Sequence, residues 1–138
     1  MLKIKINTHG NPLPKAYGDW TDLATSEDTY LRDGDFKIIP LGVSMELPAG
    51  YYAELVPRSS TFKNWGVLFV NSIGIIDNDY KGAEDIWGFP ALAMRNTLIP
   101  KGTRIAQFRV VKKGEPIEFV EDSLKGNKAR GGFGSSGE

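Results

Sequence analysis

The chemistry open to this chain is limited first by which side chains are missing or scarce. Its 138 residues include no cysteine and one histidine, His9, which lies in a stretch rich in glycine and proline and is expected to be an ordinary surface residue. Thiol nucleophiles, zinc thiolate sites and histidine-based catalysis are therefore not expected. A hydrolytic site would use carboxylates, arginine, serine and a hard cation such as Mg²⁺, which prefers oxygen ligands.

The first candidate site follows an apolar run at residues 53–56, which is expected to be a strand. After the proline that ends the run come Arg58, Ser59 and Ser60. The planar guanidinium of arginine matches phosphate oxygens, and serine hydroxyls can donate to the same group. Taken alone, the segment is more typical of a turn at a strand end with a surface arginine.

The second candidate site lies between residues 67 and 82. Val67–Val70 and Ile73–Ile76 are predicted to be two strands joined tightly at Asn71 and Ser72, forming a hairpin whose backbone could bind the edge of a planar ligand. Asp77 follows directly, and partial burial at a strand end would make its carboxylate a usable base. Aspartate is also common in turns, so the residue alone does not decide between these roles.

The third candidate is Gln107, a polar residue in a strand predicted over Thr103–Val111. Its neighbours are apolar, which suggests a positioned amide, although a satisfied or exposed strand residue would look the same. Strict alternation predicts one face with Arg104, Ala106 and Phe108 and an opposite face with Thr103, Ile105 and Gln107.

The glycine-rich C-terminus, residues 130–138, is the fourth candidate. It contains four glycines and one apolar side chain, Phe133, which is too little apolar surface to form a core. It lacks the Gly-Lys-Ser/Thr ending of a phosphate-binding P-loop. It is either a frayed end or a segment that folds over a bound anion, with Phe133 stacked on a ring and Ser135 and Ser136 as donors.

Short β-prone runs ended by Gly, Pro, Asn or Asp predict an all-β sandwich or barrel with one or two turns of helix near residues 59–64. The predicted strands are 2–6, 36–41, 51–56, 67–70, 73–76, 91–94, 103–111 and 117–120. One domain is expected over residues 1–127, followed by a flexible lid over 128–138. The balance of 17 basic and 17 acidic residues disfavours a nucleic-acid coat protein, and no apolar run is long enough to cross a membrane, so a cytoplasmic protein is expected.

In this order, the candidate segments resemble the five motifs of the trimeric dUTPase family, of bacterial or phage type. The matching segments are Asp22-Leu23, Pro57-Arg58-Ser59-Ser60, the run from Gly74 to Gly82, Arg104-Ile105-Ala106-Gln107, and the run from Gly132 to Gly137. The resemblance implies a jelly-roll-like β fold and a homotrimer whose active sites draw on all three chains. It also implies hydrolysis of dUTP to dUMP and pyrophosphate with Mg²⁺.

The resemblance also implies roles for individual residues. Asp77 would activate the attacking water, while Arg58 and Gln107 would complete the catalytic set and Asp22 would contact Mg²⁺ through water. The substrate-binding residues implied are Ser59 and Ser60 for phosphate, Asn71, Gly74 and Ile76 for uracil, Tyr80 for deoxyribose, and Arg130, Phe133, Gly134, Ser135 and Ser136 in the closing tail.

Three features depart from the family pattern. The first motif usually has Ala-Gly before its aromatic residue and Asp, whereas Asp19-Trp20-Thr21 precede Asp22 here. Arg130 stands three residues before Phe133, whereas Lys128 holds the position five residues before it, so either cation is a candidate for the γ-phosphate. The chain is also longer than usual between Tyr80 and Asn96. The added Trp87 and Phe89 would either pack at a subunit interface or help seat the base near Phe133.

Two other functions remain open at this point. A dCTP deaminase or bifunctional deaminase–diphosphatase shares the fold and the Arg-Ser-Ser element, but its additional glutamate base has no counterpart in the expected context here. A non-catalytic nucleotide-binding regulatory module would not need Asp77 as a base. The sequence leaves room for a regulatory protein partner without identifying one.

Overall fold

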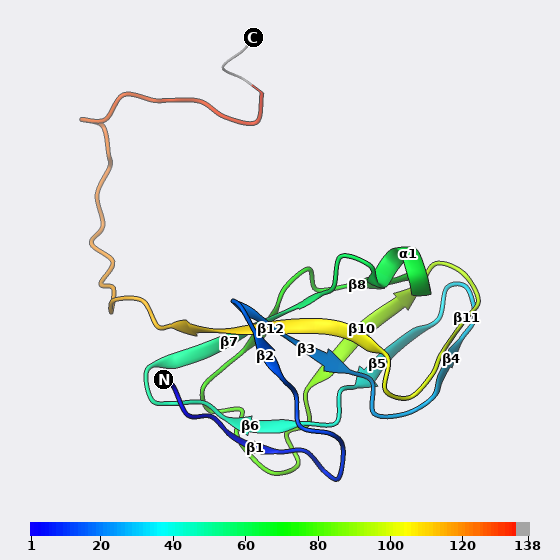
Figure 1. Ribbon diagram of the computed structural model, residues 1–138. Helices are drawn as coiled ribbons and strands as arrows, with labels where there is room; N and C mark the ends of the chain where they lie inside the picture. The colour runs from blue at the N-terminus through cyan, green and yellow to red at the C-terminus, as the bar shows by residue number, and fades with distance from the viewer. Residues whose placement is uncertain (135–138) are drawn as a thin grey trace.

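The computed structural model describes residues 1–134, which form an almost entirely β protein with one short helix (Figure 1). The elements in chain order are β1 Lys5–Asn7, β2 Ala16–Tyr17, β3 Trp20–Ala24, β4 Thr29–Leu31, β5 Phe36–Pro40, β6 Ser44–Glu46, β7 Tyr51–Pro57, α1 Thr61–Trp65, β8 Val67–Phe69, β9 Gly74–Ile76, β10 Gly88–Ala93, β11 Thr97–Ile99 and β12 Arg104–Lys112. The predicted all-β class is confirmed.

The strands form two main antiparallel sheets and two small ones. The larger main sheet has the order β2-β3-β12-β7-β9, and the smaller has the order β5-β10-β8. The pairs β1-β6 and β11-β4 extend the structure at its margins. β12 is the longest strand and is paired on both sides, so the residues it carries are held by β3 and β7 together.

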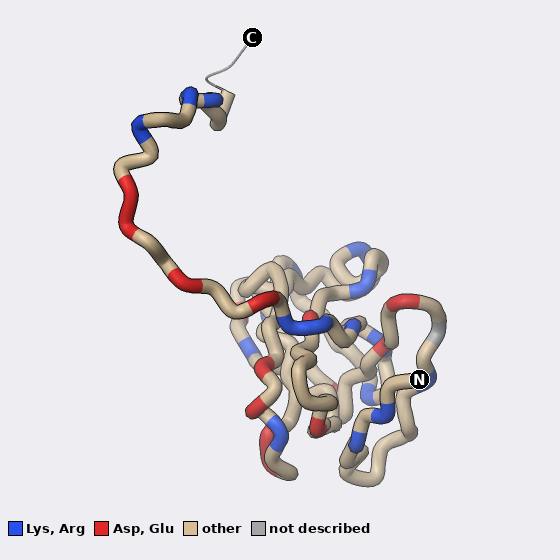
Figure 2. The backbone as a smooth tube through the Cα atoms, turned by 90° about the vertical axis from the view of Figure 1, so that its left-hand side faces the viewer, with Lys and Arg blue, Asp and Glu red and all other residues tan. Residues whose placement is uncertain are grey.

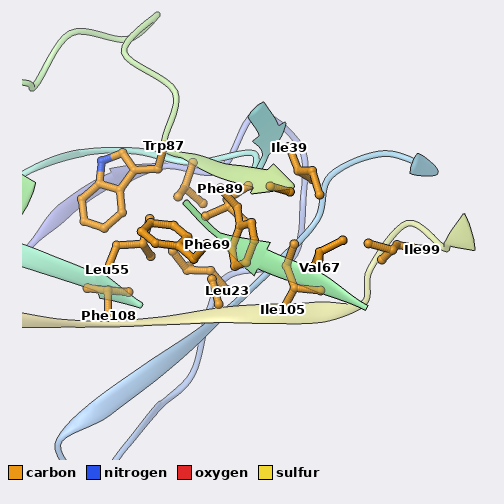
Figure 3. Packing of buried hydrophobic residues seen from close by; sticks show 14 of the residues in the cluster. Leu23, Ile39, Leu55, Val67, Phe69, Trp87, Phe89, Ile99, Ile105 and Phe108 are labelled. Carbon is orange, nitrogen blue, oxygen red and sulfur yellow. The ribbon is translucent and has the colours of Figure 1, made fainter. Parts of the chain in front are cut away.

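The core lies between the two main sheets, and aromatic rings fill much of it (Figure 3). Phe69 packs edge-on against Phe89, with ring centroids 4.8 Å apart, and Trp87 packs edge-on against Phe108 at 5.1 Å. Edge-to-face pairs at these distances add to the stabilisation that burial alone provides. Ile39 on β5, Trp87 and Phe89 are almost completely buried.

The predicted short helix is confirmed as α1. It ends at Gly66, whose φ of 66° is left-handed and whose N–H donates to the carbonyl of Phe62. Glycine adopts this conformation without the steric cost that other residues incur. None of the helices in the described chain is long and apolar enough to cross a membrane.

The predicted hairpin at residues 67–76 is wrong. β8 pairs with β10 and β9 pairs with β7, so the two strands belong to different sheets and the segment between them crosses from one sheet to the other. Contact of Phe69 with Phe89 holds β8 against β10. The crossing bends at Ser72, which has a φ of 61° and donates its N–H to the carbonyl of Phe69 at 3.2 Å.

The predicted strand at residues 117–120 is also wrong. β12 ends at Lys112, and residues 113–134 run away from the β body with no strand assigned in this range (Figure 1). Ile117, Phe119 and Val120 are highly exposed there. An extended segment forms a strand only where a neighbour supplies backbone partners, and the body of the same chain supplies none here. Residues 113–134 are called the arm below.

Candidate active site

A cluster of two arginines, one carboxylate and one amide lies on the outer face of the larger sheet. It comprises Asp22, Arg58, Arg104 and Gln107 and is called the arginine cluster below. Asp22 on β3 lies directly opposite Gln107 on β12. Oδ2 of Asp22 is 3.3 Å from Nε of Arg58 and 3.7 Å from Nη1 of Arg104. The cluster therefore presents an excess of positive charge, which suits an anion such as phosphate.

A β-bulge in β12 directs Arg104 toward this cluster. The register with β3 shifts between Arg104 and Ala106, so Ile105 is an additional residue and both Ile105 and Ala106 are fully buried. Beyond the bulge, Arg104 pairs with Ala24 and lies on the same face as Asp22. The predicted alternation is wrong here, because it placed Arg104 on the face opposite Gln107.

Arg58 is held by the turn that leads from β7 into α1. Its backbone N–H donates to Oγ1 of Thr61 at 3.0 Å, and that buried hydroxyl donates to the carbonyl of Ile105 at 2.7 Å. The guanidinium also donates to the carbonyl of Arg104 at 3.2 Å. Ser59 is exposed beside it, and Ser60 precedes the helix. Thr61 was not predicted from the sequence, because a lone threonine carries no signal until its partner on β12 is known.

A second group of predicted residues lines a cavity of about 470 Å³ beside β9, called the β9 cavity below. Its lining includes five of the predicted residues: Asn71, Gly74, Ile76, Asp77 and Tyr80. Leu55, Phe69 and Trp87 contribute apolar walls. β9 is the last strand of its sheet, and no described strand pairs with its outer edge. The cavity thus combines apolar walls with an open backbone edge, as a planar heterocycle requires.

Asp77 directly follows β9, and its side chain is exposed. It lies on the rim of the β9 cavity and also lines a neighbouring hollow with Tyr51, Tyr52 and Asn78. The Asn78 amide donates to the carbonyls of Pro48 at 2.9 Å and Tyr51 at 2.8 Å. These bonds fix the turn that carries Asp77. Asn78 was not singled out in the sequence, where Asp-Asn-Asp looks like ordinary turn composition.

The arginine cluster and Asp77 lie far apart within one chain. Ile76 on β9 pairs with Ala53 on β7, so Asp77 lies near the start of β7, whereas Arg58 follows its end. Asp77 therefore lies beside the β7 residue that is six positions before Arg58, which corresponds to about 20 Å at the usual rise of a strand. The predicted catalytic residues therefore form two half-sites in a single chain.

Trp87 and Phe89 are core residues of their own chain. Their exposures are 1% and 0%, so packing at a subunit interface is excluded for these rings, and Phe89 is too deeply buried to cover a base. Trp87 reaches the wall of the β9 cavity, and its role in seating a base stays a prediction. In the described chain its buried Nε1 has no hydrogen-bond partner.

The profile of the dUTPase family matches residues 20–137, which is most of the chain. The chain belongs to the dUTPase family. It is 54% identical over 120 residues to the SPbeta prophage-derived deoxyuridine 5'-triphosphate nucleotidohydrolase YosS of Bacillus subtilis, covering 87% of this chain and 84% of YosS. It is 34% identical to the deoxyuridine 5'-triphosphate nucleotidohydrolase of Finegoldia magna, over 99% of both chains.

Solved dUTPase structures share the fold. The dUTPase of Streptococcus mutans superposes with a TM-score of 0.73 at 25% identity, covering 83% of this chain and 98% of that one. The dUTPase of Staphylococcus bacteriophage 80alpha, solved with dUPNHPP, superposes with a TM-score of 0.80 at 20% identity, covering 99% of each chain. The resemblance noted in the five sequence motifs is thus confirmed at the level of family and fold.

The remaining predicted residues of this dUTPase family member lie in or beyond the arm. Arg130, Phe133 and Gly134 are exposed, and Phe133 has a φ of 52°. The end of the arm lies away from the β body (Figure 1). Ser135 and Ser136 lie outside the described residues. In the described chain, no three acidic or histidine side chains come together as a metal site. The choice between Lys128 and Arg130 as a phosphate ligand stays a prediction.

Proposed function

We propose that this chain hydrolyses dUTP to dUMP and pyrophosphate. The observation that carries the proposal is the grouping of the predicted residues into a ring-sized cavity with a carboxylate on its rim and a cationic cluster suited to a triphosphate. Both groups occur in a chain that belongs to the dUTPase family. A deaminase would need a glutamate base at the cavity, and none of the lining residues is a glutamate.

The β9 cavity selects the base and the sugar. Its open backbone edge at Gly74 and Ile76 offers alternating N–H and C=O groups to the polar edge of uracil, and Asn71 stands at its mouth. Tyr80 is held in place because its hydroxyl donates to the carbonyl of Ile86 at 3.1 Å. A ring fixed in that position packs under deoxyribose and leaves no room for a 2′-hydroxyl.

The arginine cluster binds the triphosphate. Arg58 and the hydroxyls of Ser59 and Ser60 contact its oxygens. Bound Mg²⁺ neutralises charge on the phosphates, and the oxygen atoms of Asp22 and Gln107 suit its water ligands. Asp77 accepts a proton from a water aimed in line at the α-phosphorus, and pyrophosphate leaves from the opposite side.

The separation of the half-sites requires more than one copy of the chain. We infer a homotrimer in which Asp77 of one copy faces the arginine cluster of another, since about 20 Å separates them within one copy. The closing segment, residues 128–138, begins within the arm and closes over the substrate. Arg130, Gly134, Ser135 and Ser136 contact the phosphates, and Phe133 stacks on uracil. Closure excludes water and aligns the triphosphate.

The test measures pyrophosphate release from dUTP, dTTP, dCTP and UTP in separate reactions with Mg²⁺, with chromatography of the nucleotide products. Release confined to dUTP is expected. Asp77→Asn should lower the rate by at least about 100-fold, because general base catalysis contributes that much. Asp33→Asn, the same change in the exposed turn between β4 and β5, is the matched control. Conversion of dCTP to a uracil nucleotide would refute the proposal.

A further inference from the structure

A buried hydroxyl on β6 links the N-terminal turn to the segment that follows Tyr80. Ser44 is 3% exposed, and its Oγ lies 3.0 Å from the backbone oxygen of Ala83 and 3.0 Å from Nε2 of His9. A carbonyl oxygen can only accept a hydrogen bond, so the single hydroxyl proton of Ser44 goes to Ala83. His9 must then donate to Oγ, which requires a proton on Nε2 of its imidazole.

The N-terminal turn holds His9 in an unfavourable backbone conformation. Its φ of 49° is left-handed, which costs free energy in residues other than glycine. The N–H of His9 donates to Oδ1 of Asn7 at 2.9 Å, and Asn7 pairs with Ser44 between β1 and β6, so the turn carries the imidazole back onto Ser44. His9 is exposed, as the sequence suggested, but its ring has a buried partner. Strain that persists in this way points to a use for the side chain.

The segment that accepts the Ser44 hydrogen bond is fixed by little packing. Residues 81–84 are exposed. A hollow of about 270 Å³ is lined by residues 5–7 of β1 on one side and by residues 81–83 on the other. Since side chains do not fill this space, hydrogen bonds must hold the segment in position. The bond from Ser44 ties it to β6.

The same segment fixes Tyr80, which lines the β9 cavity. The carbonyl of Ile86 accepts a hydrogen bond from the Tyr80 hydroxyl at 3.1 Å. Ile86 lies between the attachment at Ser44 and a second one, in which the N–H of Trp87 donates to the carbonyl of Val43 at 2.8 Å. The position of the Tyr80 ring therefore depends on how this stretch is attached to two consecutive residues at the start of β6.

We propose that His9 and Ser44 are positioning residues that set the preference for deoxyribose over ribose by holding Tyr80 in place through residues 81–86. The inference rests on the proposed function, in which the Tyr80 ring packs under deoxyribose and leaves no room for a 2′-hydroxyl. His9 and Ser44 lie outside the described lining of the β9 cavity, so they act through Tyr80. Loss of the Ser44 hydroxyl frees the segment to move, and Tyr80 moves with it.

The first test compares kcat/KM for dUTP and UTP in the natural sequence and in Ser44→Ala. The ratio of the two values should fall by roughly 3- to 10-fold, because one hydrogen bond between neutral groups changes an equilibrium constant by that factor. KM for dUTP should rise with little change in kcat, since Tyr80 does not contact the reacting phosphorus. A lower Tm with an unchanged ratio would show that Ser44 only stabilises the fold, and would overturn the proposal.

Thr103→Ala is the matched control for Ser44→Ala. It also removes a hydrogen bond from a hydroxyl to a backbone carbonyl, that of Pro100 at 2.6 Å. This bond lies in the turn before β12, away from the segment that carries Tyr80. Any effect on hydrolysis should therefore be equal for dUTP and UTP, and the ratio should not change. A fall in the ratio as large as that in Ser44→Ala would overturn the assigned route.

His9→Gly separates the imidazole from the backbone strain. Glycine adopts a φ of 49° without steric cost, so Tm should not fall. The ratio of kcat/KM for dUTP to that for UTP should nevertheless fall by roughly 2- to 5-fold. His9→Gln places an amide N–H donor near the position of Nε2 and should restore most of the ratio. A natural ratio in His9→Gly would overturn the role of His9.

A double-mutant cycle tests whether Ser44 acts through Tyr80. Tyr80→Phe removes the hydrogen bond to Ile86, so the ring no longer depends on the position of that carbonyl. Adding Ser44→Ala to Tyr80→Phe should lower the ratio by less than about twofold further, because the two changes break the same connection. Full additivity would show that Ser44 acts by another route and would overturn the proposal.

Binding of dUMP and UMP, measured by calorimetry, separates this inference from the proposed function. Selective hydrolysis of dUTP with an unchanged preference in Ser44→Ala would overturn the inference alone. If the natural sequence bound dUMP more tightly than UMP but did not hydrolyse dUTP, the diphosphatase would be overturned. In that case a weaker binding preference in Ser44→Ala would support the inference, and an unchanged one would overturn it. Absence of both hydrolysis and binding would overturn both.

Discussion

Asp22 holds two arginines that a triphosphate would also use. Its Oδ2 lies within 4 Å of both guanidinium groups, and all three side chains remain partly exposed. Ion pairs in such surroundings contribute about 0–1 kcal/mol each, so a phosphate can replace the carboxylate as partner at little cost. In the proposed function, Asp22 would therefore keep the guanidinium groups in position until the substrate binds.

Arg58→Lys tests the importance of the planar guanidinium. A lysine ammonium cannot contact Asp22 and the carbonyl of Arg104 in the geometry that the guanidinium uses. We expect kcat/KM for dUTP to fall by about 10- to 100-fold, measured by pyrophosphate release, with a change in Tm of less than a few degrees because the lost contacts are partly exposed. Lys37→Arg, a charge-preserving change at a partly exposed residue of β5 that pairs with Glu27, should leave kcat/KM unaltered.

Phe89→Ala tests the aromatic core. The ring is fully buried and packs against Phe69, so its removal leaves a cavity between the sheets. The free energy of unfolding should fall by about 3–5 kcal/mol, measured by urea denaturation. Phe89→Leu keeps most of the volume and should cost less than half as much. Equal effects of the two substitutions would contradict a role for the ring in filling the core.

At the scale of elements, the sequence predicted the strands that have clear apolar runs and missed those without them. β3 was not predicted, because the polar Thr21 and Asp22 interrupt its apolar pattern. Its position beside β12 nevertheless places Asp22 opposite Gln107. The bulge in β12 was missed because Ile105 and Ala106 are both apolar, so the pattern does not show which residue is additional.

Gly66→Ala tests the end of α1. The φ of 66° costs an alanine roughly 1–2 kcal/mol, and its Cβ would lie 2.6 Å from Cγ of Arg95. We expect Tm to fall by several degrees in thermal denaturation followed by circular dichroism. Gly114→Ala is the matched control, because nothing lies within 4 Å of the added Cβ and its φ is not left-handed. A similar loss in both variants would refute the conformational explanation.

A polar cluster on the larger sheet joins three strands, and Figure 2 shows how acidic and basic residues are spread over the chain. The Tyr52 hydroxyl donates to Oε2 of Glu54 at 3.2 Å, and Nε of Arg109 lies 3.1 Å from Oε1 of the same carboxylate. The Arg109 guanidinium lies over the Trp20 ring at 5.1 Å. Burial raises the pKa of Tyr52 above its ordinary value of 10, and the hydrogen bond to Glu54 raises it further.

Because the pKa of Tyr52 is raised in the folded chain, the neutral phenol stabilises the fold below pH 10, and this contribution is lost as the pH rises through the folded pKa. In an alkaline titration followed by ultraviolet absorbance, one of the 5 tyrosines should ionise later than an exposed tyrosine. Tyr52→Phe should remove the late component. Tyr30→Phe, at an exposed residue, should leave it in place.

At the scale of the molecule, the sequence suggested candidate catalytic residues but not how far apart they lie. Arg58, Asp77 and Gln107 were chosen from their local types and neighbours. Their separation depends on the register of β9 against β7, in which Ile76 pairs with Ala53. That register is set by contacts between segments far apart in the sequence, so no local pattern encodes it.

Mixing two inactive variants tests the shared site directly. In the proposed homotrimer, Asp77→Asn removes the base and Arg58→Ala removes a phosphate ligand, so each variant alone should be inactive toward dUTP. In a trimer that contains both, a site formed by Arg58 of one copy and Asp77 of another retains both natural residues. Random assembly of equal amounts should restore about one quarter of the natural rate, because each site draws these residues from two independent copies.

The double variant Asp77→Asn with Arg58→Ala distinguishes complementation from residual activity. When it is co-refolded with the natural chain at a ratio of 1:1, a site still works only where both contributing copies are natural, so about one quarter of the fully natural rate is again expected. If instead each chain carried a complete site, this mixture would keep about one half of the rate and the two single variants would stay inactive together. Shared sites therefore give about the same rate in the two mixtures, whereas separate sites give activity only in the mixture with the natural chain. This comparison holds even if the absolute rates vary between preparations.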